Sequence, residues 1–281
     1  MKSFVVAAML LALTPTPGIA STLGPYDNLP IEELRQIDKD ALSKAEKKAY
    51  KKALKAAEKA EKKRLKAEKK AKKEAQKVAR NVLKVRDASR IIRDEFEADT
   101  QIKGPKYSYS DMQTVYQLGN GGEVQYFIRS YMNLEEGRLK SELYLIIKQK
   151  TVVDMDLLAS KKLTPVGYAN RQRLWANYST AKLRGGVARE LIPVNKSGDV
   201  SYGIGSFYEE AIISLDPQDL IAGLGNFSSF DFKLSRGKKS DLVISIPAHY
   251  ITGYMIKFMQ ATGVENPVVA GVEQEFETMA Q

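Results

Sequence analysis

Apolar and polar side chains alternate along two stretches near the middle of the chain. From Val124 to Ser130 the even-numbered positions share one face, and from Ser141 to Ile147 the odd-numbered positions do. An alternation of period two is typical of strands that bury one face. The sequence therefore predicts two strands here, and a third in Gln113–Leu118, which the glycine-rich residues 119–122 join to the first in a hairpin.

The later part of the chain continues with strands and short helices. A strand is predicted for Phe207–Leu215, a short helix after Asp216, and a second hairpin for Phe230–Leu234 and Leu242–Ile246. A proline then opens a helix with four apolar residues on one side: Ile251, Tyr254, Met255 and Phe258. Residues 152–205 show no clear pattern. We expect residues 94–262 to form one α+β domain, an antiparallel β-rich fold with a short helix and a C-terminal helix.

The N-terminal part has the composition of one long helix. No glycine or proline occurs between Ile31 and Lys103, and the best helix formers dominate residues 41–75. Ser43 and Glu46 have the spacing of a capping box. We predict a long α-helix over residues 38–93, preceded by an N-terminal segment over residues 21–37.

Apolar positions along this helix recur every eleven residues. They are Leu42, Ala45, Ala49, Ala53, Ala56, Ala60, Arg64, Ala67, Ala71, Ala75, Val78 and Val82, with Arg64 the one polar exception. Such a repeat keeps a stripe on one face and gives a slight right-handed supercoil in a coiled-coil assembly. Because alanine buries little area, we expect weak self-association through this Ala/Val face and stronger packing between Val78 and Ile92.

The opposite face of the predicted helix is basic. Ten cations at spacings of three and four form what we call the basic stripe: Lys51, Lys55, Lys59, Lys62, Lys66, Lys70, Lys73, Lys77, Arg80 and Lys84. Residues 31–93 hold 23 basic and 10 acidic side chains, whereas residues 94–281 hold 20 basic and 23 acidic ones, so the basic character belongs to this segment. We interpret the stripe as a ligand-binding surface for a polyanion. The alternative is a solvated face that keeps an alanine-rich helix in solution.

The N-terminus has the layout of a bacterial export signal. Lys2 precedes ten apolar residues, Phe4–Leu13, and Gly18 and Ala20 place small residues at the −3 and −1 positions. This layout predicts a signal peptide over residues 1–20, cleaved between Ala20 and Ser21, and hence a periplasmic or secreted protein.

The residue inventory limits the chemistry of the chain. There is no cysteine and one histidine, His249, so disulfides, thiolate metal sites and multi-histidine metal sites cannot form within one chain. We predict no cofactor, no metal site and no catalytic residue, and we expect His249 to be exposed and inert. Asp154 and Asp156 place two carboxylates on one predicted strand face, which is too few ligands for a good calcium site.

Two further features concern the domain and its tail. Seven aromatic residues are candidates for lining a pocket, although such residues more often pack in a core: Tyr107, Tyr109, Trp175, Tyr178, Tyr202, Phe207 and Tyr208. The tail over residues 263–281 contains four glutamates and no Lys or Arg, and we expect it to be mobile.

Together these features favour an exported, non-enzymatic binding or scaffold protein. Its expected partner is an anionic envelope surface (lipid headgroups, lipopolysaccharide or a cell-wall polymer) or another protein. Nucleic acid is disfavoured, because the stripe nearly lacks aromatic residues for base stacking. Two alternatives stay open: an envelope hydrolase that uses carboxylates and has the helix as a tether, and a helical spacer anchored by an uncleaved signal.

Overall fold

The computed structural model describes the chain at residues 26, 29–93, 99–111, 114, 117–118, 121–133, 136–184, 187–216, 219–220, 229–236, 241–263 and 267–280. The chain divides into two compact units, Met1–Lys73 and Glu74–Gln281, with the boundary inside helix α3 (Lys44–Ala88). The predicted signal peptide lies outside the described residues.

In the first unit a short helix packs against the beginning of a long one. Helix α2 (Ile31–Gln36) places Leu34 against Tyr50 of α3, and both side chains are buried. The Tyr50 hydroxyl donates a hydrogen bond of 3.0 Å to the Leu34 carbonyl. The predicted capping box is confirmed, because the backbone N–H of Ser43 donates to the Glu46 carboxylate and that of Glu46 donates to the Ser43 hydroxyl.

Helix α3 is shorter at both ends than the predicted 38–93. It ends at Ala88, and the Ser89 hydroxyl donates back to a carbonyl of the last turn. The prediction that the helix continues to residue 93 is wrong, since Arg90–Arg93 form strand β1 and pair with strand β2 (Asp99–Lys103). Two consecutive β-branched isoleucines in β1 favour this strand over a further helical turn.

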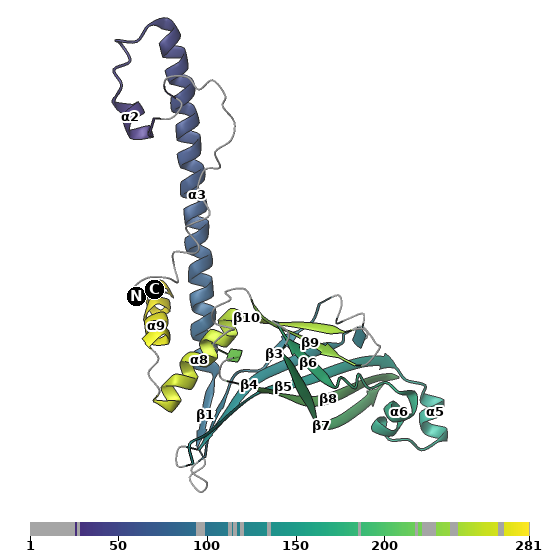
Figure 1. Ribbon diagram of the computed structural model, residues 1–281. Coiled ribbons are helices and arrows are strands. Elements are labelled where there is room, and N and C mark those ends of the chain that lie inside the picture. The colour runs from purple at the N-terminus through teal and green to yellow at the C-terminus, as the bar shows by residue number, and fades with distance from the viewer. Residues whose placement is uncertain are drawn as a thin grey trace. The chain divides into compact units, whose positions relative to one another are not determined.

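The second unit is built on one antiparallel ten-stranded sheet (Figure 1). Its other strands are β3 (Tyr107–Tyr109), β4 (Glu123–Asn133), β5 (Arg138–Val152), β6 (Thr180–Leu183), β7 (Ala188–Ser201), β8 (Ile204–Leu215), β9 (Ser229–Ser235) and β10 (Leu242–Pro247). The spatial order is β1-β2-β4-β5-β8-β7-β6-β9-β10, and β3 pairs with β4 off this path. The helices of this unit that the structure describes with bounds, besides the end of α3, are α5 (Met155–Ser160), α6 (Pro165–Gln172), α8 (Ala248–Thr262) and α9 (Pro267–Ala280). The unit is therefore α+β, as predicted.

One face of the sheet and helix α8 form the main hydrophobic core. The positions of β4 and β5 that were predicted to share a face are all buried: Val124, Tyr126, Ile128, Ser130, Ser141, Leu143, Leu145 and Ile147. Helix α8 contacts β2, β4, β9 and β10 and lies against the curved sheet (Figure 1). Its residues Ile251, Tyr254 and Met255 are buried, and Phe258 packs against the same core. The predicted strand β8 and the predicted β9–β10 hairpin are confirmed as well.

The hydroxyl of Tyr250 fills a gap in the hydrogen bonding of β4. One edge of β4 pairs with β2 through residues 129–133 and with β3 through residues 124–126. Near that gap, the backbone N–H of Ile128 donates to the Tyr250 hydroxyl (3.1 Å), which itself donates to the Pro105 carbonyl (2.8 Å). A β-carbon on Gly104 would lie 2.6 Å from this hydroxyl, so a glycine is needed where the tyrosine approaches the chain.

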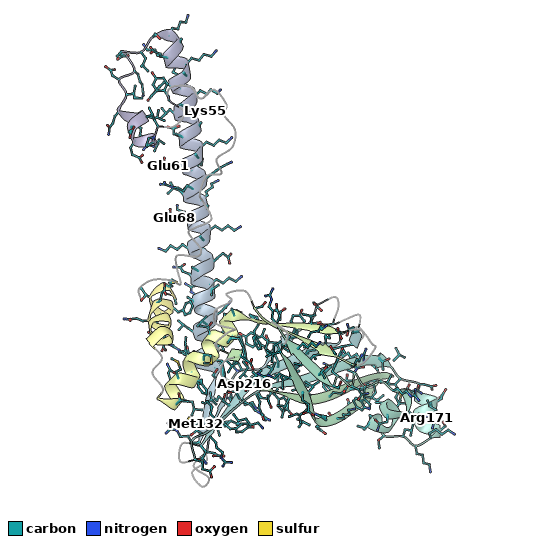
Figure 2. The ribbon with its side chains drawn as sticks, viewed as in Figure 1. Lys55, Glu61, Glu68, Met132, Arg171 and Asp216 are labelled. Carbon is teal, nitrogen blue, oxygen red and sulfur yellow. The ribbon has the colours of Figure 1, made fainter. Side chains whose placement is uncertain are left out.

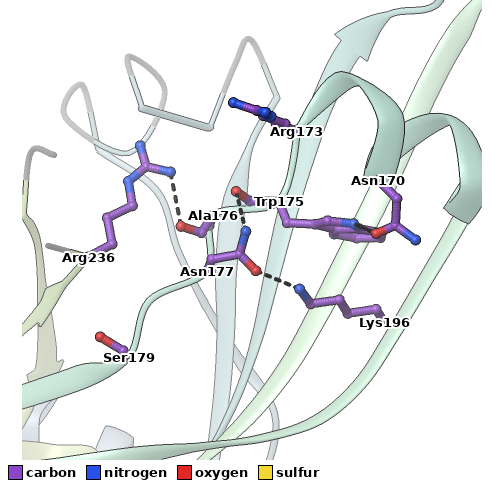
Figure 3. Close-up of a pocket in the computed structure, with 8 residues that line it drawn as sticks. All are labelled: Asn170, Arg173, Trp175, Ala176, Asn177, Ser179, Lys196 and Arg236. Atoms are coloured by element: carbon purple, nitrogen blue, oxygen red, sulfur yellow. Dashed lines mark hydrogen bonds between the residues drawn. The ribbon is translucent and has the colours of Figure 1, made fainter.

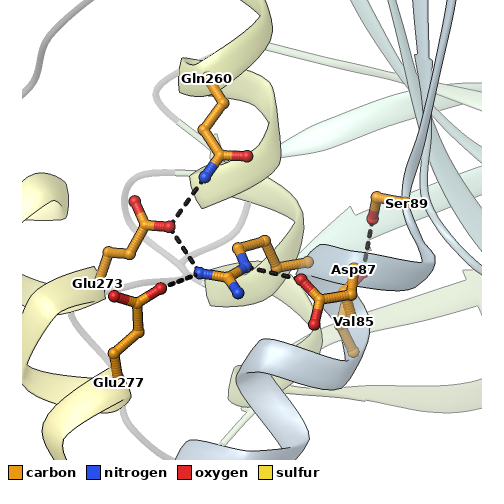
Figure 4. Close-up of polar contacts among 7 residues, drawn as sticks. Val85, Asp87, Ser89, Gln260, Glu273 and Glu277 are labelled. Atoms are coloured by element: carbon orange, nitrogen blue, oxygen red, sulfur yellow. Dashed lines mark hydrogen bonds and ion pairs between the residues drawn. The ribbon is translucent and has the colours of Figure 1, made fainter.

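The C-terminal end of α3 is held by ion pairs from α9 (Figure 4). Nη1 of Arg86 contacts the carboxylates of Glu273 at 2.7 Å and Glu277 at 2.6 Å, and the Gln260 side-chain amide of α8 donates to Glu273 at 2.8 Å. Residues 267–280 of the acidic tail form α9, and the expected mobility of the tail stays a prediction. The glutamates that suggested a solvated tail compensate the charge of a partly buried arginine instead.

Two further local predictions are wrong because aspartates form caps. The described members of Gln113–Leu118 are helical, and the Asp111 carboxylate accepts bonds from the backbone N–H and the hydroxyl of Thr114, each at 2.7 Å. Asp154 does not share a strand face with Asp156, because its carboxylate caps the first turn of α5. In both places a short polar side chain satisfies free N–H groups at a helix start.

The remaining segments complete the second unit. Residues 152–205, which show no clear pattern in the sequence, contain α5, α6, β6 and β7. The short helix predicted after Asp216 is described only at residues 219–220, which are helical. In the part of the chain that the structure describes, no helix is both long and apolar enough to cross a membrane.

Candidate functional site

All ten side chains of the basic stripe are exposed. The members from Lys51 to Lys73 belong to the first unit, and the other three belong to the second. Among the described residues, none of the ten forms an ion pair with a carboxylate. Figure 2 shows the long side chains along α3, with Lys55, Glu61 and Glu68 labelled. The stripe thus presents uncompensated positive charge.

Helix α2 covers the side of α3 that faces away from the stripe. At about 100° per residue, Tyr50, Ala53 and Ala57 lie opposite the centre of the stripe, and these residues pack in the cluster with α2. Arg35 of α2 forms an ion pair of 3.5 Å with Glu61 on the same side. The fold of the first unit therefore leaves the lysines open to a ligand.

The predicted Ala/Val face is only partly buried. Ala53 and Val82 are buried within their own units, whereas most of the positions between them are exposed. The stronger packing predicted between Val78 and Ile92 is confirmed within this range, where Ala79, Val82 and Val85 are buried. The two end residues, Val78 and Ile92, are more than 40% exposed. The face remains a predicted surface for weak self-association.

The buried carboxylates in the described part of the chain have fixed partners. Glu142 contacts Nε of Arg129 at 2.8 Å and Nζ of Lys140 at 2.6 Å. Burial raises the pKa of Glu142, but the hydrogen bonds from Lys140 and Arg129 outweigh burial and hold this pKa below its ordinary value. A general acid in a hydrolase needs the opposite shift. No group of three or more acidic or histidine side chains in the described residues is placed to hold a metal ion.

His249 is half-buried, contrary to the expectation that it is exposed. Its ring lies 6.2 Å from that of Tyr107, at the start of α8. Burial lowers the pKa of the imidazole below its ordinary value, because the charged form loses hydration. His249 therefore packs against Tyr107.

A cavity of about 490 Å³ lies beside the one tryptophan of the chain (Figure 3). Its eight lining residues come from the end of α6, the following loop 173–179, strand β7 and the end of β9. These segments meet because β6, which follows the loop, pairs with β7 on one side and β9 on the other. The order of the strands in the sheet therefore brings the lining residues of the cavity together.

A buried carboxylate shapes the wall of this cavity. Glu209 of β8, which is 7% exposed, accepts hydrogen bonds from the backbone N–H groups of Ala176 and Asn177. Asn177 has a φ of 49°, a left-handed conformation that asparagine tolerates better than most residues. Glu209 thus accepts two backbone hydrogen bonds of the loop at its left-handed residue.

Three cations surround the opening. The ammonium of Lys196 donates to the Asn177 amide at 2.6 Å and lies 5.1 Å above the Trp175 ring. The guanidinium of Arg236 donates to the Ala176 carbonyl at 3.1 Å and lies 5.3 Å from the ring of Tyr178. Arg173, with a left-handed φ of 52°, is exposed on the rim. The wall is positively charged and polar, with the hydroxyl of Ser179 also lining it.

Trp175 anchors the cavity to a small second core. Its indole N–H donates to the Asn170 side chain at 2.6 Å, and its ring meets Phe207 edge-on, with centroids 5.9 Å apart. Of the seven aromatic residues predicted as pocket candidates, Trp175 lines the cavity, and Phe207 and Tyr178 lie behind the wall. Tyr202, in contrast, is fully exposed on the β7–β8 turn.

Sequence reasoning missed the three cations and Glu209. They are scattered over loop, strand and strand end, and no spacing in the sequence marks them. The tryptophan was the one usable signal, since a single indole among polar residues is often a wall of a site. Comparisons of the chain with protein families, with curated proteins and with solved structures find no match.

Proposed function

We propose that this is an exported, non-enzymatic binding protein whose basic stripe contacts an anionic envelope component. The observation that carries the proposal is the stripe itself: ten exposed cations, none paired with a carboxylate among the described residues. Anionic lipid headgroups are the first candidate ligand, and lipopolysaccharide and cell-wall polymers present the same chemistry. A protein partner with an acidic face remains a weaker candidate.

The physical basis is the mutual repulsion of like charges on one helix face. Neighbours at spacings of three and four residues lie about 5–6 Å apart, which is inside the screening length of about 8 Å at physiological salt. An anionic surface relieves this repulsion and releases counterions, so the affinity should fall as salt is added. The stripe lacks the dense large apolar residues that membrane insertion requires, so we expect contact at the headgroup level.

The alternative of a carboxylate hydrolase has less support. Glu142 and Glu209 are the buried carboxylates of the described residues, and both are bound by fixed donors. Such carboxylates stabilise the fold and are poorly suited to exchange protons with a substrate. The alternative of an uncleaved anchor concerns residues 1–20, which lie outside the described residues.

Export predicts a mature chain that begins at Ser21. The sequence layout at Gly18 and Ala20 suits signal cleavage after Ala20. Intact-mass measurement of the protein from the envelope fraction of an expressing bacterium should give the mass of residues 21–281. Retention of residues 1–20 on the envelope protein would favour the anchored alternative.

Replacing Lys55, Lys62, Lys66 and Lys73 with glutamine should weaken binding to anionic vesicles. Each basic residue held near an anionic lipid surface contributes about 1 kcal/mol, so loss of four predicts a decrease of up to roughly a thousandfold and a shallower salt dependence. Glutamine preserves helix propensity, so the helical content by circular dichroism should not change. Co-sedimentation with phosphatidylglycerol vesicles at several salt concentrations measures the effect.

A matched control variant also removes four positive charges, but at positions outside the stripe. Lys39, Lys47, Arg64 and Lys72 are exposed residues of the first unit that are not members of the stripe. Their replacement with glutamine should reduce vesicle binding much less. If both variants lost vesicle binding equally, or if the wild type showed no salt-sensitive binding, the stripe would serve only to keep the helix in solution.

A further inference from the structure

We infer that the cavity beside Trp175 is a binding site for a phosphate monoester of a small polar molecule. This site lies in the second unit and shares no residue with the basic stripe on which the proposed function rests. The inference depends on the charge balance of the cavity, on the way its cations are held and on its size.

The cavity carries an excess of positive charge. Arg173, Lys196 and Arg236 line it, and within the described residues neither arginine forms an ion pair with a carboxylate. Nε of Arg236 is also buried without a hydrogen-bond partner there. Partly buried guanidinium groups usually find an acidic partner in the protein, and an anionic ligand would supply the missing one.

Glu209 neutralises only part of this charge. Its oxygens accept bonds from the backbone N–H groups of Ala176 and Asn177, and its distance to the Lys196 ammonium is 3.9 Å. Three cations and one carboxylate leave a charge of about +2, which matches a phosphate monoester with a charge of about −1.5 to −2 at neutral pH. A ligand with a single carboxylate group would neutralise only half of this net positive charge.

Two of the three cations are held in place before any ligand arrives. Lys196 is fixed by Asn177 and the Trp175 ring, and Arg236 by the Ala176 carbonyl and the Tyr178 ring. Immobilised donors lose less conformational entropy on binding. The planar guanidinium forks of the two arginines suit the paired oxygens of a phosphoryl group.

The volume of the cavity leaves room beyond a phosphoryl group. About 490 Å³ lies in the range of small-molecule sites, and the rest of the lining offers polar groups from Asn170, Asn177 and Ser179. Trp175 is only 4% exposed and its ring is covered by Lys196, so it is not a free stacking platform. These walls favour a hydroxylated substituent, such as a sugar, over a flat aromatic one.

The single tryptophan makes the test direct. Since Trp175 is the only indole in the chain and lies in the cavity wall, its fluorescence should change saturably when glucose 6-phosphate or inorganic phosphate binds to the full-length mature protein at constant ionic strength. Glucose alone should produce no saturable change. Tighter binding of glucose 6-phosphate than of phosphate identifies an ester as the ligand, whereas equal affinities mean that the phosphoryl group is recognised alone.

Variants separate the site from general electrostatics. Arg173→Gln alters an exposed side chain and should weaken glucose 6-phosphate binding by about tenfold, and Arg236→Gln should weaken it at least as much. Arg171→Gln removes an exposed charge of α6 that does not line the cavity, and it should leave the affinity nearly unchanged. Unfolding temperatures of all three variants check that the fold is retained.

Three outcomes would overturn the inference: no saturable change with either phosphate compound up to millimolar concentrations, an equal response to glucose, or equal losses in the Arg171 and Arg173 variants. The variant with four stripe lysines replaced by glutamine separates this result from the proposed function. It should bind vesicles poorly and still bind glucose 6-phosphate with wild-type affinity. Loss of the fluorescence response in that variant would assign the anion binding to the helix instead of the cavity.

Discussion

Replacing Gly253 with alanine should destabilise the protein, although the same change in an isolated helix would stabilise it by about 1 kcal/mol. Gly253 lies inside α8 where this helix packs on α3. A β-carbon there would lie 2.4 Å from the Val82 carbonyl oxygen and 2.7 Å from the β-carbon of Val85. Backbone and β-carbon atoms cannot rotate away, so α8 has to move from α3 to accept a side chain.

The larger change Gly253→Val should cost about 3 kcal/mol of unfolding free energy, at the upper end of the range for overpacked cores. Urea unfolding followed by circular dichroism measures this loss. Lys257→Val on the same helix is the control, because it introduces the same β-branched residue at a half-buried position that already carries a long side chain. If Gly253→Ala stabilised the protein, or if the two valine variants were equally stable, the close approach of the two helices would be refuted.

Glu209→Ala should be the second most damaging substitution, with a loss of about 3 kcal/mol. The backbone N–H groups of Ala176 and Asn177 would lose their acceptor, and each unsatisfied buried donor costs about 1–3 kcal/mol. Lys196 would also lose its nearest carboxylate. Since Asn177 would no longer be held in its left-handed conformation, the cavity wall should relax and glucose 6-phosphate binding should be lost as well.

The neighbouring residue provides the control for this prediction. Glu210 points to the other face of β8, where its carboxylate accepts one hydrogen bond from the Tyr144 hydroxyl. Glu210→Ala should therefore reduce the unfolding free energy by about 1 kcal/mol and leave the fluorescence response of Trp175 intact. Equal destabilisation by the two variants would contradict the role assigned to Glu209.

Patterns of short range predicted much of the fold. The alternation in residues 124–130 and 141–147 gave the buried faces of β4 and β5, because strand periodicity depends only on neighbouring residues. The capping box at Ser43 formed for the same reason. The exposure of the basic stripe also followed from the sequence, since ten cations on one helix face have no apolar surface to bury.

The errors arose where a local pattern allowed more than one structure. Residues 113–118 look apolar enough for a strand, but Asp111 caps a helical turn there. The acidic tail carries no local sign of its partner, since Glu273 and Glu277 pair with Arg86 of α3. The Asp111 cap is a local feature, and the sequence around it suits either structure. The ion pairs of Arg86 join residues far apart in the sequence, and no window of neighbouring residues contains that information.

The sequence by itself determined an α+β chain with a basic helix, because helix propensity, charge and strand alternation are properties of adjacent residues. Only the tertiary structure decided that Gly253 must stay a glycine and that Trp175 faces a cavity. Arg173, Lys196 and Arg236 meet because β6 pairs with both β7 and β9, and a strand order is not encoded in any local pattern. The charge of the cavity depends in turn on Glu209, whose role arises from the backbone of a loop that it contacts only in the folded chain.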